Sequence, residues 1–351
     1  MAKLKGKPLV GLDIGSKWIK AVELVPTDEG MALTNYMVEE IQGGTDLKEI
    51  LKNLFHKSSF QTKKVVTAVS GRSVIVRYIM MPEMPDDELK NAIRYEASKY
   101  IPFEVEEVVL DCQRLTYETK EEKEEAPKTA AKEMRVLLVA VKKNTIDEQL
   151  NTLEGAGLWP HIIDVDVFAL GNAFELHEML STARGEVNQS VALIDIGSVK
   201  TSVNIMHNIN SYFTREISIG GNDLTEAISK KLGIEPSQAE TLKRDPGLKE
   251  TELIEVTSGV LDDLYHEIHL SFDYFEHQFE KHIDLIYLSG GASRLKWLPD
   301  SFEKAFEKRP IMWNPLENIA IINENIDQAD LNSKLSQLAI ATGLASRLRG
   351  K

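Results

Sequence analysis

The hydrophobic positions of this chain switch repeatedly between the two-residue period of strands and the 3.6-residue period of helices, which indicates an α/β protein. Apolar runs indicate a strand hairpin at 8–25 and further strands at 31–40, 65–70, 73–80, 108–116, 134–141, 162–166, 191–196, 202–207, 211–218 and 285–288. Helical spacing follows at 46–56, 86–100, 145–155, 167–181, 222–231, 236–243, about 251–281 and 335–347.

A near-repeat divides this pattern into two halves. The segment Gly11–Ser16 reads GLDIGS, and residues 193–198 read LIDIGS. In each copy an apolar run ends at an aspartate, passes through a turn of small residues and continues as a second apolar run. This is a strand-turn-strand pattern, so we expect two related half-domains that share one ligand.

Length and composition favour an ordinary globular protein with more than one lobe. A chain of 351 residues is longer than a single hydrophobic core usually accommodates, so we expect two or more lobes. The single cysteine, Cys112, cannot form an intramolecular disulfide and fits a reducing compartment. The N-terminus lacks the apolar core of a signal peptide, and no apolar run approaches the length of a membrane span. We therefore expect a cytoplasmic protein without direct membrane insertion.

The charge balance limits the classes of partner. A formal net charge of −14 disfavours nonspecific binding to nucleic acid or to anionic lipid. An anionic nucleotide would need local dipoles, lysines and a divalent cation. Histidines on the helix at about 251–281 lack the spacing of a zinc-protease site, so they are expected to be surface or packing residues.

The glycine-containing turns indicate a phosphate site of an unusual kind. The chain contains neither a P-loop nor the Gly-x-Gly-x-x-Gly dinucleotide motif. A tight strand-turn-strand can instead direct successive backbone N–H groups at a phosphate. Asp13 and Asp195, one at each strand end, would hold a hydrated Mg²⁺. Lys20 can reach the phosphates from the return strand, and Ser198 and Thr201 offer hydroxyl groups.

A third small-residue turn, Ser289–Ala292, completes a set that resembles the actin-like ATPase superfamily. The resemblance implies two duplicated ribonuclease-H-like lobes around a cleft that binds ATP and Mg²⁺. It also matches the Ala-Glu-x-x-Lys helix at 239–243, and it places Asp166 where relatives orient the attacking water with a longer side chain. The residues expected at the nucleotide are Asp13, Gly15, Ser16, Lys17, Lys20, Asp195, Gly197, Ser198, Thr201, Gly220, Gly221, Glu240, Lys243, Gly290, Gly291, Ala292 and Arg294.

An inserted α+β segment narrows the resemblance to the FtsA and PilM branch. Residues 82–157 are expected as the inserted subdomain, 1–81 with 158–190 as the first lobe, and 191–351 as the second lobe, with a nucleotide-binding subdomain at about 222–285. The segments 81–85, 96–103 and 137–143 are similar to the PilM family of type IV pilus proteins.

This family implies a scaffold that is peripheral to the inner membrane and relays its nucleotide state to the pilus machine. Its expected partner is the cytoplasmic N-terminus of PilN, held in a groove between the first lobe and the inserted subdomain. Other platform proteins and motor ATPases are further possible partners. The chain stops at Lys351 without the amphipathic anchor of FtsA, so attachment through a partner is expected, with at most weak ATPase activity.

Two alternatives remain open at this point. One is an FtsA-like division protein that forms filaments, and the other is a small-molecule kinase of the same superfamily. A kinase would turn over ATP only with an acceptor, whereas a filament protein would sediment with ATP. The charged stretch 118–127 has no apolar period and is expected as an exposed loop.

Overall fold

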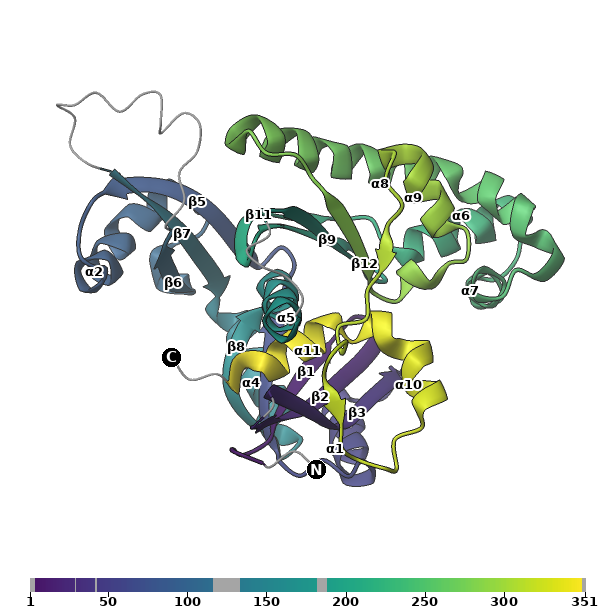
Figure 1. Ribbon diagram of the computed structural model, residues 1–351, viewed down its shortest axis with the longest axis horizontal. Coiled ribbons are helices and arrows are strands. Elements are labelled where there is room, and N and C mark those ends of the chain that lie inside the picture. The colour runs from purple at the N-terminus through teal and green to yellow at the C-terminus, as the bar shows by residue number, and fades with distance from the viewer. Residues whose placement is uncertain (1–3, 29, 42, 116–132, 182–187, 349–351) are drawn as a thin grey trace.

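The computed structural model describes residues 4–28, 30–41, 43–115, 133–181 and 188–348. The charged stretch 118–127 lies outside these ranges. Figure 1 shows two lobes stacked on each other, with a smaller unit beside the upper one. Within the described ranges, no helix has both the length and the apolar character that a bilayer crossing requires.

The lower lobe in Figure 1 is built on a mixed sheet that is covered on both faces. Its strand order is β14-β3-β2-β1-β4-β8. The strands are β1 (Leu9–Ile14), β2 (Trp18–Thr27), β3 (Gly30–Glu40), β4 (Lys64–Val69), β8 (Trp159–Val165) and β14 (Ala320–Ile321). Leu9 packs with α5 (Asp166–Leu180), whereas Val10 and Leu12 pack against α1 (Leu47–Lys57) and α4 (Lys143–Gly155). Burial on both faces explains why β1 is apolar almost throughout.

The upper lobe repeats this plan. Its sheet has the order β11-β10-β9-β12-β13. The strands are β9 (Ser190–Ile196), β10 (Thr201–His207), β11 (Asn210–Ile217), β12 (Leu285–Ser289) and β13 (Ile311–Met312). The helices are α6 (Gly221–Leu232), α7 (Pro236–Arg244), α8 (Glu250–Phe279) and α9 (Leu298–Phe306). The predicted stripe on α8, which includes Leu261, Ile268 and Phe275, is buried in this core.

The order β3-β2-β1-β4-β8 in one sheet corresponds, strand for strand, to β11-β10-β9-β12-β13 in the other. In both sheets the first hairpin is antiparallel and its first strand pairs in parallel with the fourth. The near-repeat in the sequence is therefore a repeat of a whole five-strand unit.

The smaller unit is inserted between β4 and β8 of the lower lobe. Its sheet has the order β5-β7-β6, with β5 (Val74–Pro82), β6 (Val108–Arg114) and β7 (Glu133–Lys142). Helix α2 (Asp86–Glu96) covers one face through Leu89 and Ile93. Its bounds differ from the expected 82–157: the unit begins one strand earlier, with β5, and ends with β7, because α4 packs in the lower lobe.

Two helices lie between the sheets and join the lobes. Figure 1 places α5 and α11 (Ala339–Ala345) side by side at the centre of the molecule. They approach so closely that a Cβ on Gly343 would lie 1.7 Å from the carbonyl oxygen of Ala169. The close contact explains why the small residues of 339–345 are all buried.

The C-terminal segment differs from the expected assignment to the second lobe. β14 pairs with β3 of the first sheet, and α11 packs on β1. α10 (Gln328–Lys334) also lies on this side, where the Tyr36 hydroxyl donates to Asp330. The chain therefore crosses back to the first lobe, because the apolar face of α11 is completed by residues of both halves.

Candidate functional site

A cleft of about 770 Å³ lies between the two lobes. The two hairpin turns, the start of α5, the helix α7 and the Gly-Gly turn after β12 line it. Most of the residues predicted for the nucleotide meet here. Those that line the cleft are Asp13, Gly15, Ser16, Lys17, Lys20, Asp166, Asp195, Gly197, Ser198, Gly221, Glu240, Lys243, Gly291, Ala292 and Arg294.

Three predicted residues are not part of the cleft lining. The Thr201 side chain is fully buried, and its hydroxyl donates to the Ile219 carbonyl. A Cβ on Gly220 would lie 2.7 Å from the backbone nitrogen of Lys200. Gly290 has a φ of +90°, and its Cβ would lie 2.4 Å from the Ile196 carbonyl oxygen. These positions shape the turns around the cleft.

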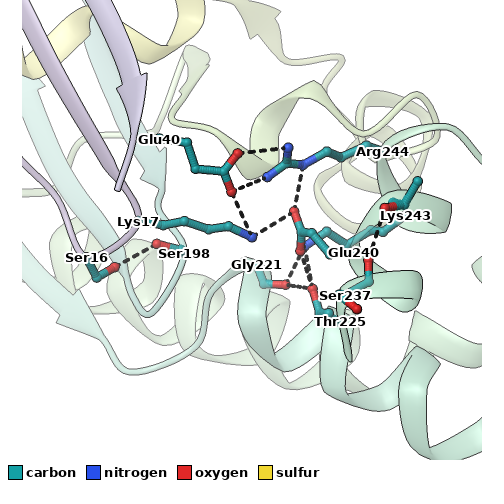
Figure 2. Close-up of polar contacts among 11 residues, drawn as sticks. Ser16, Lys17, Glu40, Ser198, Gly221, Thr225, Ser237, Glu240, Lys243 and Arg244 are labelled. Carbon is teal, nitrogen blue, oxygen red and sulfur yellow. Dashed lines mark hydrogen bonds and ion pairs between the residues drawn. The ribbon is translucent and has the colours of Figure 1, made fainter. Parts of the chain in front are cut away.

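The two hairpin turns have the same backbone hydrogen bond. The Gly15 N–H donates to the Trp18 carbonyl at 3.0 Å, and the Gly197 N–H donates to the Lys200 carbonyl at 2.9 Å. The turns face each other across the cleft, because the hydroxyl oxygens of Ser16 and Ser198 lie only 2.7 Å apart (Figure 2). The duplicated turns therefore lie opposite each other, one on each side of the cleft.

The first hairpin brings a lysine against its aspartate. Asp13 and Lys20 are directly opposite in the β1-β2 register, and Lys20 Nζ lies 2.8 Å from Asp13 Oδ2. Burial lowers the pKa of Lys20, but attraction to Asp13, Asp195 and Asp166 outweighs it and raises the pKa. Lys20 stays charged at the centre of the cleft.

The aspartate of the second hairpin, Asp195, is harder to ionise because it is buried. Burial raises the pKa of Asp195 to about 6, although Lys20 and a hydrogen bond from the Ser289 hydroxyl oppose the rise. Ser202 stands opposite Asp195, as Lys20 stands opposite Asp13. The seven-residue spacing of the first hairpin, applied to the second, selects Ser202 rather than the predicted Thr201.

These carboxylates fit a cation held mainly by other groups. The described residues contain no cluster of three or more acidic, histidine or cysteine side chains able to hold a metal alone. Mg²⁺ in phosphate sites keeps several waters and uses one or two carboxylates plus phosphate oxygens. Asp13 and Asp195, one from each lobe, match that requirement.

Asp166 opens α5 and is held at both oxygens. Its Oδ1 accepts from the Val167 N–H at 2.7 Å, and its Oδ2 lies 2.6 Å from Lys200 Nζ. Burial raises the pKa of Asp166, and the adjacent Lys200 counteracts this rise. Both oxygens of the Asp166 carboxylate therefore already have a protein partner.

The predicted pair on α7 forms a compact hydrogen-bonded group (Figure 2). Lys243 Nζ donates to Glu240, to the Thr225 hydroxyl and to the Gly221 carbonyl, all within 2.8 Å. Burial opposes ionisation of Glu240, but hydrogen bonds from Lys243 and Thr225 lower its pKa to about 2. Glu240 is therefore an anion anchored to α6.

The same helix reaches across to the first lobe. Lys17 Nζ lies 3.3 Å from Glu240, and Arg244 lies 3.3 Å from Glu40 of β3 (Figure 2). The Arg244 guanidinium also stacks over Trp18, 5.3 Å from the ring centre. Glu40 and Arg244 were not predicted, because ordinary charged surface positions carry no motif; their signal exists only in three dimensions.

The chain is similar in sequence and in structure to a known protein family. The family described as Type IV pilus assembly protein PilM matches residues 11–349. The chain belongs to this PilM family. A chain of the solved PilM-PilN type IV pilus biogenesis complex is 28% identical, with a TM-score of 0.82 over 97% of this chain and 98% of that one. The predicted family and the actin-like fold class are both confirmed.

Two other proteins are more distantly similar to this chain, one in fold and one in sequence. EutJ from Carboxydothermus hydrogenoformans is 14% identical, with a TM-score of 0.55 over 98% of this chain and 90% of EutJ. The cell division protein FtsA of Bacillus subtilis is 24% identical over 276 residues, which are 71% of this chain and 61% of FtsA. The match thus spans less than two thirds of FtsA. The PilM family model, in contrast, matches residues 11–349 of this chain.

Proposed function

We propose that this PilM-family protein binds ATP with Mg²⁺ in the cleft between its lobes and relays the nucleotide state to a partner at the pilus assembly platform. The single observation that carries the nucleotide assignment is the pair of matching turns, which face each other with one aspartate each. Backbone N–H groups and small residues at such turns suit phosphate oxygens.

The side chains divide the work of binding along the cleft. Asp13 and Asp195 would hold Mg²⁺ through water, and Lys20 would neutralise phosphate charge. Glu240 and Lys243 lie further along the cleft, where they would contact the nucleoside. The bound cation would offset the repulsion between the triphosphate and the two aspartates.

Hydrolysis by this site is proposed to be weak at most. Water activation requires a base within hydrogen-bond reach of the water. The Oδ2 atom of Asp166 is already paired with Lys200, and aspartate is a short side chain for this task. The nucleotide would therefore act mainly as a clamp between the lobes, with its differential contacts setting their equilibrium.

The proposed partner is the cytoplasmic N-terminal peptide of PilN. The face of the inserted sheet opposite α2 carries Val76, Leu137, Val139 and Val109 by strand alternation. Tyr78 and Arg135 on this same face contact β11 and α8, so only its outer part, on β6, is open. Val109 is 46% exposed there. An extended apolar peptide would remove this face from water, and PilN would thereby hold the protein at the cytoplasmic side of the inner membrane.

The nucleotide assignment is tested by calorimetric titration with Mg·AMPPNP. Asp13→Ala removes one of the two proposed Mg²⁺ carboxylates and the partner of Lys20, so affinity should fall at least tenfold. Glu226→Ala removes a carboxylate on the exposed side of α6 and serves as the control. Equal affinities in Asp13→Ala and the parent protein would refute the assignment.

The partner assignment is tested by fluorescence anisotropy with a labelled peptide that covers the PilN N-terminus. Val109→Asp places a charge on the exposed outer part of this face and should weaken binding at least tenfold. Tyr95→Asp changes an 83% exposed residue on α2, on the other side of the sheet, and should leave binding unaltered. If the two substitutions act alike, the peptide does not use this face.

A further inference from the structure

A lysine that the sequence did not single out lies between two carboxylates in the cleft. Lys200 follows the second hairpin turn, pairs with Asp166 at 2.6 Å and also forms an ion pair with Glu216. Its side chain is only 19% exposed. Burial lowers the pKa of Lys200, but the two carboxylates outweigh this and raise it. The ammonium group is therefore a fixed positive charge beside the proposed phosphate site.

Glu216 connects this lysine to the inserted subdomain. It lies near the end of β11, and its Oε2 accepts a hydrogen bond from the Gly71 N–H at 3.0 Å. Gly71 has a φ of +84° and occupies the turn between β4 and β5. That turn is the point where the chain leaves the first lobe and enters the inserted sheet. One carboxylate thus joins both lobes and the root of the insertion.

The same strand contacts the inserted sheet a second time. Tyr78 of β5 is half-buried, and its buried hydroxyl lies near Thr214 and Ser211 of β11. The Arg135 guanidinium lies 5.5 Å from the centre of the Phe279 ring, at the end of α8. Figure 1 shows the inserted sheet lying against β11 and this end of α8. A shift of β11 would therefore reach the inserted subdomain directly.

Phosphate in the cleft would change the partners of Lys200. A triphosphate on the second hairpin brings several negative charges close to the ammonium group, while it repels Asp166 and Glu216. We propose that Lys200 and Glu216 form a switch that couples occupancy of the cleft to the inserted subdomain. When Lys200 turns to the phosphates, Glu216 loses its counter-charge, and repulsion from the phosphates draws it away from the Gly71 N–H. This inference rests on the proposed nucleotide binding.

Hydrogen exchange followed by mass spectrometry tests the switch in the full chain. Each variant is first titrated to find a saturating concentration of Mg·AMPPNP, and exchange of segment 70–80 is then compared with and without nucleotide. In the parent protein the Gly71 amide within this segment should exchange at least about threefold faster when nucleotide is bound, because its acceptor is withdrawn. In Glu216→Gln and Lys200→Gln this response should fall by more than half.

Arg215→Gln is the matched control. Arg215 is the neighbour of Glu216 on β11, but its ion pair is with Glu267 of α8, within the same lobe. This variant should keep the full response. If nucleotide binds but leaves segment 70–80 unchanged in the parent protein, or if Glu216→Gln responds fully, the switch is refuted and the proposed function stands. If no nucleotide binds, both fall.

Discussion

The pKa values of single residues in the cleft are set by the balance between burial and their immediate partners. Glu240 is held as an anion by Lys243 and Thr225, with a pKa of about 2. Asp195 differs, because burial raises its pKa to about 6 despite Lys20 and Ser289. Ionisation of Asp195 therefore costs folding free energy in the absence of a bound cation. Such a cost is typical of functional carboxylates.

Asp195→Asn should stabilise the ligand-free protein at alkaline pH. The raised pKa means that the native state binds this proton more tightly than the unfolded chain, so the parent protein loses stability as pH rises from about 4 to about 6. Chemical denaturation should show the variant more stable by about 1–3 kcal/mol at pH 8. The difference should vanish near pH 4; a constant difference across this range would contradict the argument.

Individual elements were predictable where the residues that define them are adjacent in the chain. The hairpin 8–25 and the stripe on α8 follow from local period, and Lys20 follows from strand alternation. By contrast, β13 and β14 are two residues long and show no period. Lys200, Glu216 and Arg244 gain their roles from elements that are distant in sequence, so no local pattern marks them.

The close crossing of α5 and α11 depends on the absence of a side chain at Gly343. Gly343→Val should destabilise the protein by about 3 kcal/mol or more, because the new Cβ would meet the Ala169 carbonyl, which is rigid backbone. Thermal unfolding measures the effect. Gly259→Ala is the control: it lies inside α8 with open space around its Cβ, and should stabilise by about 0.5–1 kcal/mol. Equal effects of the two changes would contradict the close crossing.

At the scale of the whole molecule, the cleft and the inserted subdomain both contact the second lobe. The second lobe contributes one of the two hairpin turns of the cleft and also contacts the start of the insertion through β11. The first lobe contributes the other hairpin turn, and the insertion begins and ends in it. Under the proposed function, closing the lobes on a nucleotide would change the surroundings of the inserted sheet, and the coupling between the two sites would be reciprocal by linkage.

Titration of the PilN N-terminal peptide with and without saturating Mg·AMPPNP tests this account most directly. Coupling of about 1–3 kcal/mol would change the peptide Kd by at least about fivefold. The peptide must then change the nucleotide affinity by the same factor. A peptide Kd that is identical with and without bound nucleotide would contradict the account.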